Sequence, residues 1–151
     1  MNPIAARWYF LALAVAGLAA AFIPWMYANR RQLSKKELQA AKELWCSRHI
    51  LDYDIKLQVE DGEKRVSLVR VRKGSMTDVM DNGRFVESGW DGRDVRGLFK
   101  VVEELLALKS SADYLVADFH PDLGFPIRVV WRPRVGMRRE WIVRMDFPDV
   151  H

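Results

Sequence analysis

The stretch 94–109, DVRGLFKVVEELLALK, carries the clearest helical pattern in the chain. Its large apolar residues recur at helical spacing and would form one continuous stripe: Val95, Leu98, Phe99, Val102, Leu105 and Leu106. Asp94 stands just before the stripe, where a carboxylate can accept hydrogen bonds from free backbone N–H groups. The pattern therefore predicts an amphipathic helix over 94–109 that packs its stripe on the core of a domain.

The segment before this helix has the pattern of β-strands. Residues 52–60, DYDIKLQVE, alternate between polar and apolar side chains, which predicts a half-buried antiparallel strand with Tyr53, Ile55 and Leu57 on its inner face. A second strand is predicted over 65–72, where a change of apolar phase indicates a bulge. In 77–86, the pair Asn82-Gly83 predicts a tight hairpin turn.

The remaining elements complete a small domain. Strands are predicted over 114–119, 127–131 and 140–147, and an earlier helix is predicted over 34–49, where Ser34 and Glu37 fit a capping box. The order of elements predicts an α+β domain, with an antiparallel sheet of about five to six strands and two helices packed on one face. Cys46 is the only cysteine, so no disulfide can form within the chain.

The N-terminal part predicts a membrane anchor. Residues 8–28 contain no charge and as a helix would reach about 31 Å, which is the thickness of a bilayer's hydrocarbon core. We therefore expect a short tail over 1–7, a transmembrane helix over 8–28, a basic juxtamembrane segment over 29–33 and a single domain over 34–151. The residues expected at the membrane interface are aromatic or basic: Trp8, Tyr9, Trp25, Tyr27, Arg30, Arg31, Lys35 and Lys36.

A cleaved signal peptide is the alternative interpretation of the same segment. Ala19, Ala20 and Ala21 fit a cleavage site, and cleavage near Phe22 would release a secreted domain. The apolar run continues to Met26, beyond the length of a usual signal peptide's apolar region, and this favours a retained signal anchor.

The net positive charge is concentrated directly after the predicted transmembrane helix. Residues 29–50 carry six basic and two acidic side chains, whereas residues 51–151 carry seventeen basic and eighteen acidic ones. A nearly neutral folded part argues against nucleic acid as a partner, and a basic juxtamembrane cluster favours anionic lipid headgroups. The excess of positive charge after the span predicts that the domain lies in the cytoplasm.

Several short motifs occur in the order of a known pattern. They are Leu44-Trp45 followed by Tyr53-Asp54, then Val95-Arg96-Gly97-Leu98-Phe99, then the turn that contains Asp118, Pro121, Gly124 and Pro126. In these motifs the chain resembles an uncharacterised bacterial family of small membrane-anchored or lipoprotein domains, whose pattern is LW…YDY, V-x-G-L-F and D-P-x-x-G-[YF]-P. The chain differs in having His120 before the proline and in lacking the cysteine pair that many members carry.

The resemblance implies a fold and an association with the bacterial cell envelope. It implies no catalytic residues, because the family has no assigned activity. It also implies that the domain lies outside the cytoplasm, in conflict with the charge count.

Candidate sites in the soluble part are few. Asp118, His120 and Asp122 could serve a metal-assisted hydrolase, although the same residues fit a turn. Arginines gather in the last strands and could contact phosphate headgroups or an acidic protein: Arg128, Arg132, Arg134, Arg138, Arg139 and Arg144. We expect a single-pass, non-enzymatic binding or accessory module without a cofactor, whose partners are the lipid bilayer and an unidentified protein.

Overall fold

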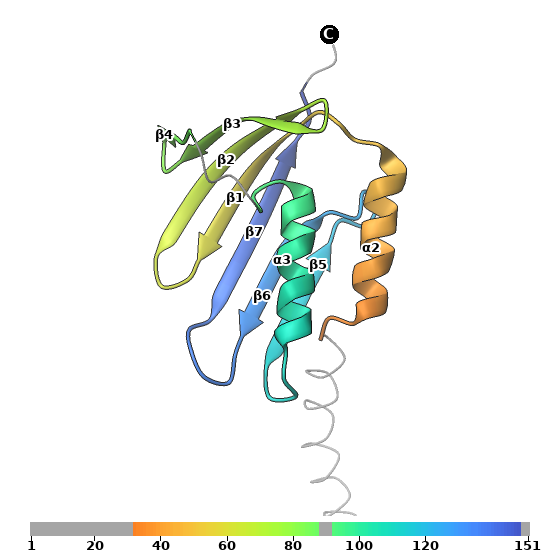
Figure 1. Cartoon of the computed structure of the whole chain (residues 1–151), viewed down its shortest axis with the longest axis vertical. Coiled ribbons are helices and arrows are strands. Elements are labelled where there is room, and N and C mark those ends of the chain that lie inside the picture. Colours follow the sequence, from red (N-terminus) through yellow and green to blue (C-terminus); the bar gives the residue numbers. More distant parts are fainter. Residues whose placement is uncertain (1–31, 88–91, 149–151) are drawn as a thin grey trace, which may run out of the picture. The chain divides into compact units, whose positions relative to one another are not determined.

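The computed structural model describes residues 32–87 and 92–148 (Figure 1). The predicted tail, the transmembrane helix over 8–28 and most of the juxtamembrane segment lie outside these residues. None of the helices within them has both the length and the apolar character needed to cross a membrane. Residues 33–151 form one compact unit.

The domain is α+β, with a seven-stranded sheet in which every pairing is antiparallel. The strands lie in the order β4-β3-β2-β1-β7-β6-β5. The elements in chain order are α2 (Lys35–Arg48), β1 (Tyr53–Glu60), β2 (Lys64–Arg72), β3 (Ser75–Asp81), β4 (Arg84–Phe85), α3 (Val95–Leu108), β5 (Tyr114–Phe119), β6 (Pro126–Arg132) and β7 (Arg139–Asp146).

The predicted count of five to six strands is too low, because the Asn-Gly hairpin divides the region 77–86 into two strands. Asn82 and Gly83 both have positive φ, 47° and 81°, as a tight hairpin turn requires. The turn pairs Asp81 of β3 with Arg84 of the two-residue strand β4. The hairpin itself is confirmed.

The predicted bulge in the second strand is wrong. β2 pairs with β1 without interruption, from Tyr53↔Val71 to Glu60↔Lys64. The register shift lies on the other side of β2, where Arg70 pairs with Asp78 but Val71 pairs with Met76. The change of apolar phase in the sequence has a different cause. Ser67 occupies an inner-face position and is buried, whereas Leu68 points to the opposite face and is 46% exposed.

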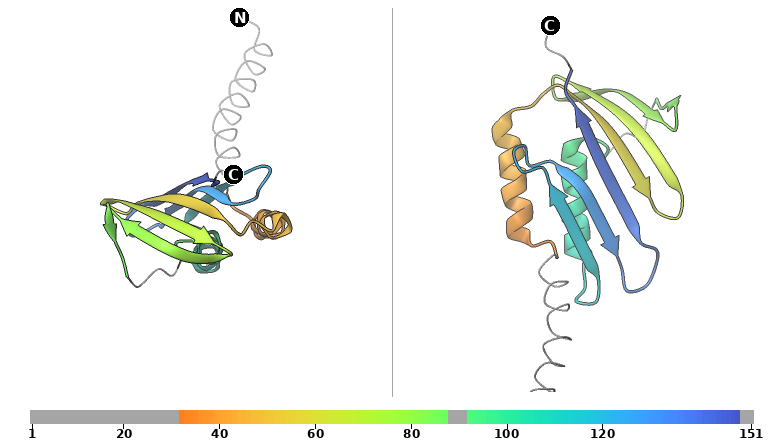
Figure 2. Two further views of the ribbon diagram at one scale, coloured as in Figure 1. Left: turned by 90° about the horizontal axis from the view of Figure 1, so that it is seen from above. Right: turned by 180° about the vertical axis from the view of Figure 1, so that it is seen from behind.

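Both predicted helix caps are present. The Ser34 hydroxyl accepts a hydrogen bond from the Glu37 backbone N–H, and the Glu37 carboxylate accepts one from the Ser34 N–H at 2.9 Å. At the second helix the Asp94 carboxylate accepts a hydrogen bond from the Gly97 N–H at 2.8 Å. α3 packs mainly on β5 and β6, and α2 lies beside α3 (Figures 1 and 2).

One core joins the helices to the sheet. The predicted stripe of α3 is buried except for Leu106, which is partly buried against the core, and so are Tyr53, Ile55 and Leu57 of β1. Trp45 of α2 places its ring edge-to-face on Tyr53 at 5.5 Å and on Phe125 at 6.2 Å. Trp141 of β7 is only partly buried against this core.

The turn between β5 and β6 packs directly on the backbone of α2. Gly124 has φ +80°, and a Cβ atom there would lie 2.3 Å from the Ala41 carbonyl oxygen and 2.9 Å from the Trp45 nitrogen. Only glycine fits at position 124, because other residues rarely adopt this φ and their Cβ atom would clash with the backbone of α2. The contact places Phe125 against Trp45 and so fixes the position of α2.

We predict that Gly124→Ala destabilises the domain far more than Gly83→Ala. Gly83 has a similar φ of +81°, but no atom lies within 4 Å of its would-be Cβ. Gly83→Ala should therefore cost only the backbone term of about 1–2 kcal/mol. Gly124→Ala should add an overpacking cost of about 1–3 kcal/mol.

Chemical denaturation of residues 32–151 would measure the difference in free energy of unfolding. Similar losses for the two variants would contradict the close contact between the turn and α2.

Candidate functional site

Of the predicted hydrolase residues, His120 and Asp122 belong to the β5–β6 turn and Asp118 lies on β5. The His120 N–H donates to the Phe125 carbonyl at 2.8 Å, and the His120 carbonyl accepts from the Gly124 N–H at 2.8 Å. The imidazole stacks on the Phe125 ring with centroids 5.0 Å apart, and its Nδ1 lies 3.3 Å from the Asp122 backbone N–H. Asp118 is exposed on β5, opposite Arg128.

Within the described ranges, no three His, Cys, Asp or Glu residues come together as metal ligands could. The turn is a structural feature in which Pro121 is exposed and Gly124 and Pro126 are buried. The sequence left both the site and the turn open; the hydrogen bonds place His120 and Asp122 in the turn, and Asp118 precedes it on β5.

The motif segments meet in space. Trp45, Tyr53 and Phe125 come from three of them and form the aromatic contact described above. In the V-x-G-L-F segment, a Cβ on Gly97 would lie 2.2 Å from the Gly92 Cα, so the start of α3 packs closely on the chain that leads into it. These motif residues therefore hold the fold together.

Tyr53 links β1 to the start of α3. Its side chain is 3% exposed, and its hydroxyl interacts with the backbone of Val95. Burial, followed by the negative charge of Asp94, raises the pKa of Tyr53 to about 12, although the Val95 hydrogen bond and Arg96 act in the opposite direction. The neutral phenol is therefore the form that the fold accommodates.

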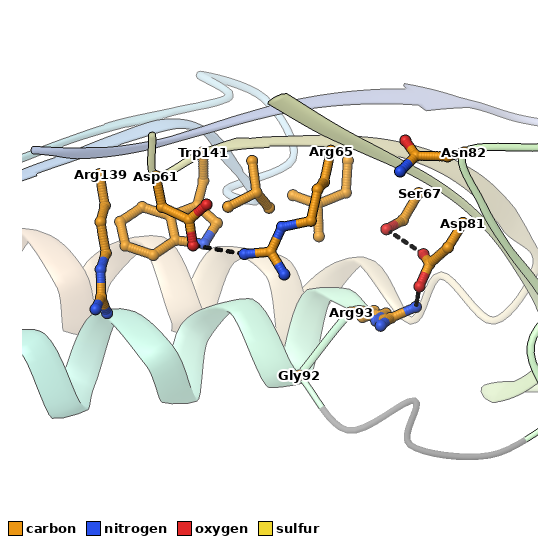
Figure 3. Close-up of a pocket in the computed structure, with 11 residues that line it drawn as sticks. Asp61, Arg65, Ser67, Asp81, Asn82, Gly92, Arg93, Arg139 and Trp141 are labelled. Carbon is orange, nitrogen blue, oxygen red and sulfur yellow. Dashed lines mark hydrogen bonds and ion pairs between the residues drawn. The ribbon is translucent and has the colours of Figure 1, made fainter. Parts of the chain in front are cut away.

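A cavity of about 320 Å³ lies on the inner face of the sheet, beside the part that α3 covers (Figure 3). Leu57 and Val59 of β1 form part of its wall. The rest of its lining comes from β2, β3, β7, the β1–β2 and β3–β4 turns and the chain before α3: Asp61, Arg65, Ser67, Asp81, Asn82, Gly92, Arg93, Arg139 and Trp141. This cavity is the candidate binding site of the domain.

Two of the three arginines in the cavity are neutralised by carboxylates. Arg65 pairs with Asp61, and Arg93 donates to Asp81 at 2.6 Å (Figure 3). Ser67 also donates to Asp81, at 2.6 Å. Burial alone would raise the pKa of Asp81, but the hydrogen bonds from Ser67 and Arg93 and the nearby positive charges outweigh it and lower this pKa.

Arg139 is the third arginine, and its guanidinium makes no ion pair with any described residue. Arg139 pairs with Trp131 of β6 and precedes Trp141 by two residues, so Arg139 and Trp141 lie on the same inner face of the sheet. The cavity thus offers one uncompensated cation next to a half-buried indole. Such a pair can bind a small ligand that has an anionic group and an apolar body.

The sequence singled out Arg139 only as one of several arginines in the last strands, and it did not place Arg139 and Trp141 in one site. Their neighbours Arg65 and Ser67 reach the same cavity because Val59 pairs with both Arg65 and Trp141 across β1.

The predicted arginine group does not form one patch. Arg128, Arg132 and Arg144 lie on the face of the sheet opposite to the core, and Arg128 pairs with Glu140 at 2.7 Å. Arg134 and Arg138 lie in the β6–β7 loop, and Arg138 also pairs with Glu140. Lys35 and Lys36 are exposed in the first turn of α2, whereas Trp8, Tyr9, Trp25, Tyr27, Arg30 and Arg31 lie outside the described residues.

Comparisons of the chain with protein-family models, curated proteins and solved structures give no match. The resemblance to the envelope family therefore stays a prediction.

We predict that Tyr53 makes the domain less stable at alkaline pH. The unfolded phenol ionises near pH 10 and the folded one near pH 12, so the unfolded state loses its proton first. The stabilisation that comes from the neutral Tyr53 phenol is fully present below pH 10. As the pH rises to 12, the free energy of unfolding falls by about 2–3 kcal/mol in total.

The measurement is the free energy of unfolding from pH 8.5 to 12, compared between the natural chain and Tyr53→Phe. The variant should lose less stability over this interval. Parallel curves would show that Tyr53 is not held in its neutral form.

Proposed function

We propose that the protein is a single-pass, membrane-anchored binding module of the bacterial cell envelope. The uncharged stretch 8–28 carries the proposal, because it matches the thickness of a bilayer and has aromatic residues at both of its ends. The basic segment that follows supports contact with anionic headgroups. Only residues 29–32 separate this stretch from the compact unit, so the domain works close to the membrane surface.

The inner-face cavity supports a binding role for the domain. A charge that is not compensated within the protein is available to a ligand, and Arg139 provides one beside the apolar surface of Trp141. The ligand class that fits is a small anion with an aromatic or aliphatic body. A metal-assisted hydrolase at Asp118, His120 and Asp122 is the less favoured function, because the backbone and the imidazole of His120 take part in the β5–β6 turn.

We expect the full-length protein to stay in the membrane fraction after an alkaline carbonate wash and to retain its N-terminus. A spanning apolar helix is not displaced by high pH, whereas a peripheral protein is. Release by carbonate, or a mature N-terminus near Phe22, would instead identify a secreted domain.

A reporter enzyme fused after His151 would show on which side of the membrane the domain lies. The charge count predicts the cytoplasmic side and the resemblance predicts the outer side. A reporter enzyme that becomes active only in an oxidising compartment distinguishes them.

We further expect the cavity to bind 1-naphthoate, which combines a carboxylate with an apolar double ring. In residues 32–151 labelled with ¹⁵N, naphthoate should shift the indole N–H resonance of Trp141. Arg139→Gln should weaken binding about fivefold, which corresponds to the loss of about 1 kcal/mol from one hydrogen bond to a charged group at a partly exposed site.

Arg144→Gln is the matched control, because Arg144 is exposed on the opposite face of the sheet. It should leave the affinity unchanged. Equal effects of the two substitutions, or no shift of the Trp141 resonance at millimolar naphthoate, would show that the cavity is not the binding site.

A further inference from the structure

We infer that one end of the domain docks directly on an anionic lipid bilayer through apolar loop tips that insert between headgroups. This end, here called the loop end, comprises residues 32–34, 61–63, 108–113 and 133–138. The inference rests on the proposed membrane anchor and adds a second, separate contact with the same bilayer.

The four segments of the loop end are tied together. The Leu33 N–H donates to the Leu115 carbonyl at 2.9 Å, so the start of the domain is fastened to β5. Asp113 accepts hydrogen bonds from the backbone N–H groups of Ser110 and Arg134, both at 2.8 Å, and so joins two loops. Figure 1 and the right-hand view of Figure 2 place these loops and the start of α2 at the same end of the domain.

The β1–β2 turn belongs to the same surface. A Cβ on Gly62 would lie 2.7 Å from the Met137 sulfur, so this methionine rests against the turn. The loop end is therefore a surface supported by hydrogen bonds and packing, rather than a set of independent loops.

Large apolar side chains project from this surface. Val135 is 86% exposed, Leu108 75% and Met137 61%. Water solvates such side chains poorly, and grouped exposure of this kind marks an interaction surface. Val135 and Met137 stand in one loop between Arg134 and Arg138, which is the arrangement of an interfacial membrane contact: apolar tips flanked by cations.

The charges of the loop end favour an anionic partner. Lys35, Lys36 and Arg134 are exposed there. The nearby carboxylates are mostly occupied: Glu37 caps α2, Asp61 pairs with Arg65, and Asp113 holds the loops. Glu63 is exposed but is followed directly by Lys64.

The short link between the predicted membrane helix and the domain favours a lipid bilayer as the partner of the loop end. The uncharged stretch ends at Ala28, and five residues later the chain is fastened to the loop end at Leu33. Five extended residues span at most about 18 Å. An anchored chain therefore holds the loop end within reach of the headgroups at a high effective concentration, so that even a weak surface contact forms.

A single fluorophore can report this contact in the full-length protein. Cys46 is the natural label site for the far end, since it is exposed in the last turn of α2, about 17 Å along the helix from Lys35. The loop end is labelled in Cys46→Ser/Val135→Cys. Both proteins carry nitrobenzoxadiazole, a dye that is sensitive to polarity, and are reconstituted into liposomes of phosphatidylcholine with or without phosphatidylglycerol.

In liposomes with phosphatidylglycerol, we expect a blue-shifted emission at position 135 and strong quenching by nitroxide-labelled lipids. The label on Cys46 should show neither effect. Adding Lys35→Gln, Lys36→Gln and Arg134→Gln to the variant labelled at position 135 should reduce the quenching. The matched control Lys56→Gln/Arg144→Gln, on the exposed face of the sheet, should not change it.

Three results would overturn the inference. If the protein floats with the liposomes but both labels are quenched equally, the anchor holds and the docking is wrong. If position 135 is protected from aqueous iodide but not quenched by nitroxide lipids, a second copy or another protein covers the loop end. If the protein fails to float with the liposomes, the anchor itself is wrong, and the docking that rests on it is lost too.

Discussion

The backbone of Gly124 lies against the backbone of α2, and this contact positions the only aromatic side chain of that helix. Trp45 then contacts Tyr53 of β1 and Phe125 directly before β6, so one side chain connects a helix to both halves of the sheet. α2 buries few other residues, namely Leu38 and Ala41. The position of α2 depends on this close approach.

The candidate site exists because α3 covers only part of the inner face of the sheet. α3 packs mainly on β5 and β6, and part of the inner face of β1, β2 and β7 borders a cavity instead. Polar side chains can occupy inner-face positions there because they satisfy one another: Ser67 and Arg93 both donate to Asp81. Arg139 is the exception among the cavity's charges, and a ligand can use it for that reason.

The local elements could be predicted because their signals lie in neighbouring residues. The stripe of α3, the caps at Ser34 and Asp94 and the Asn82-Gly83 turn each depend on contacts within a few positions. The errors arose where a local pattern has two explanations. The change of apolar phase in 65–72 indicated a bulge, but β2 pairs regularly with β1. The pattern changes because a polar residue, Ser67, occupies a buried position. Ser67 can be buried there because its hydroxyl donates a hydrogen bond to Asp81 on the neighbouring strand.

The sequence by itself determined the α+β class, the helices, most of the strands and the prediction of an anchor, since periodicity and charge are properties of consecutive residues. Only the tertiary structure decided which distant residues meet. The pairing of β1 with β7 brings Trp141 and Arg139 to the cavity that Arg65 and Ser67 line, and the hydrogen bonds of Leu33 and Asp113 gather the loop end. Such pairings depend on strand register across many tens of residues, and no local pattern encodes that register.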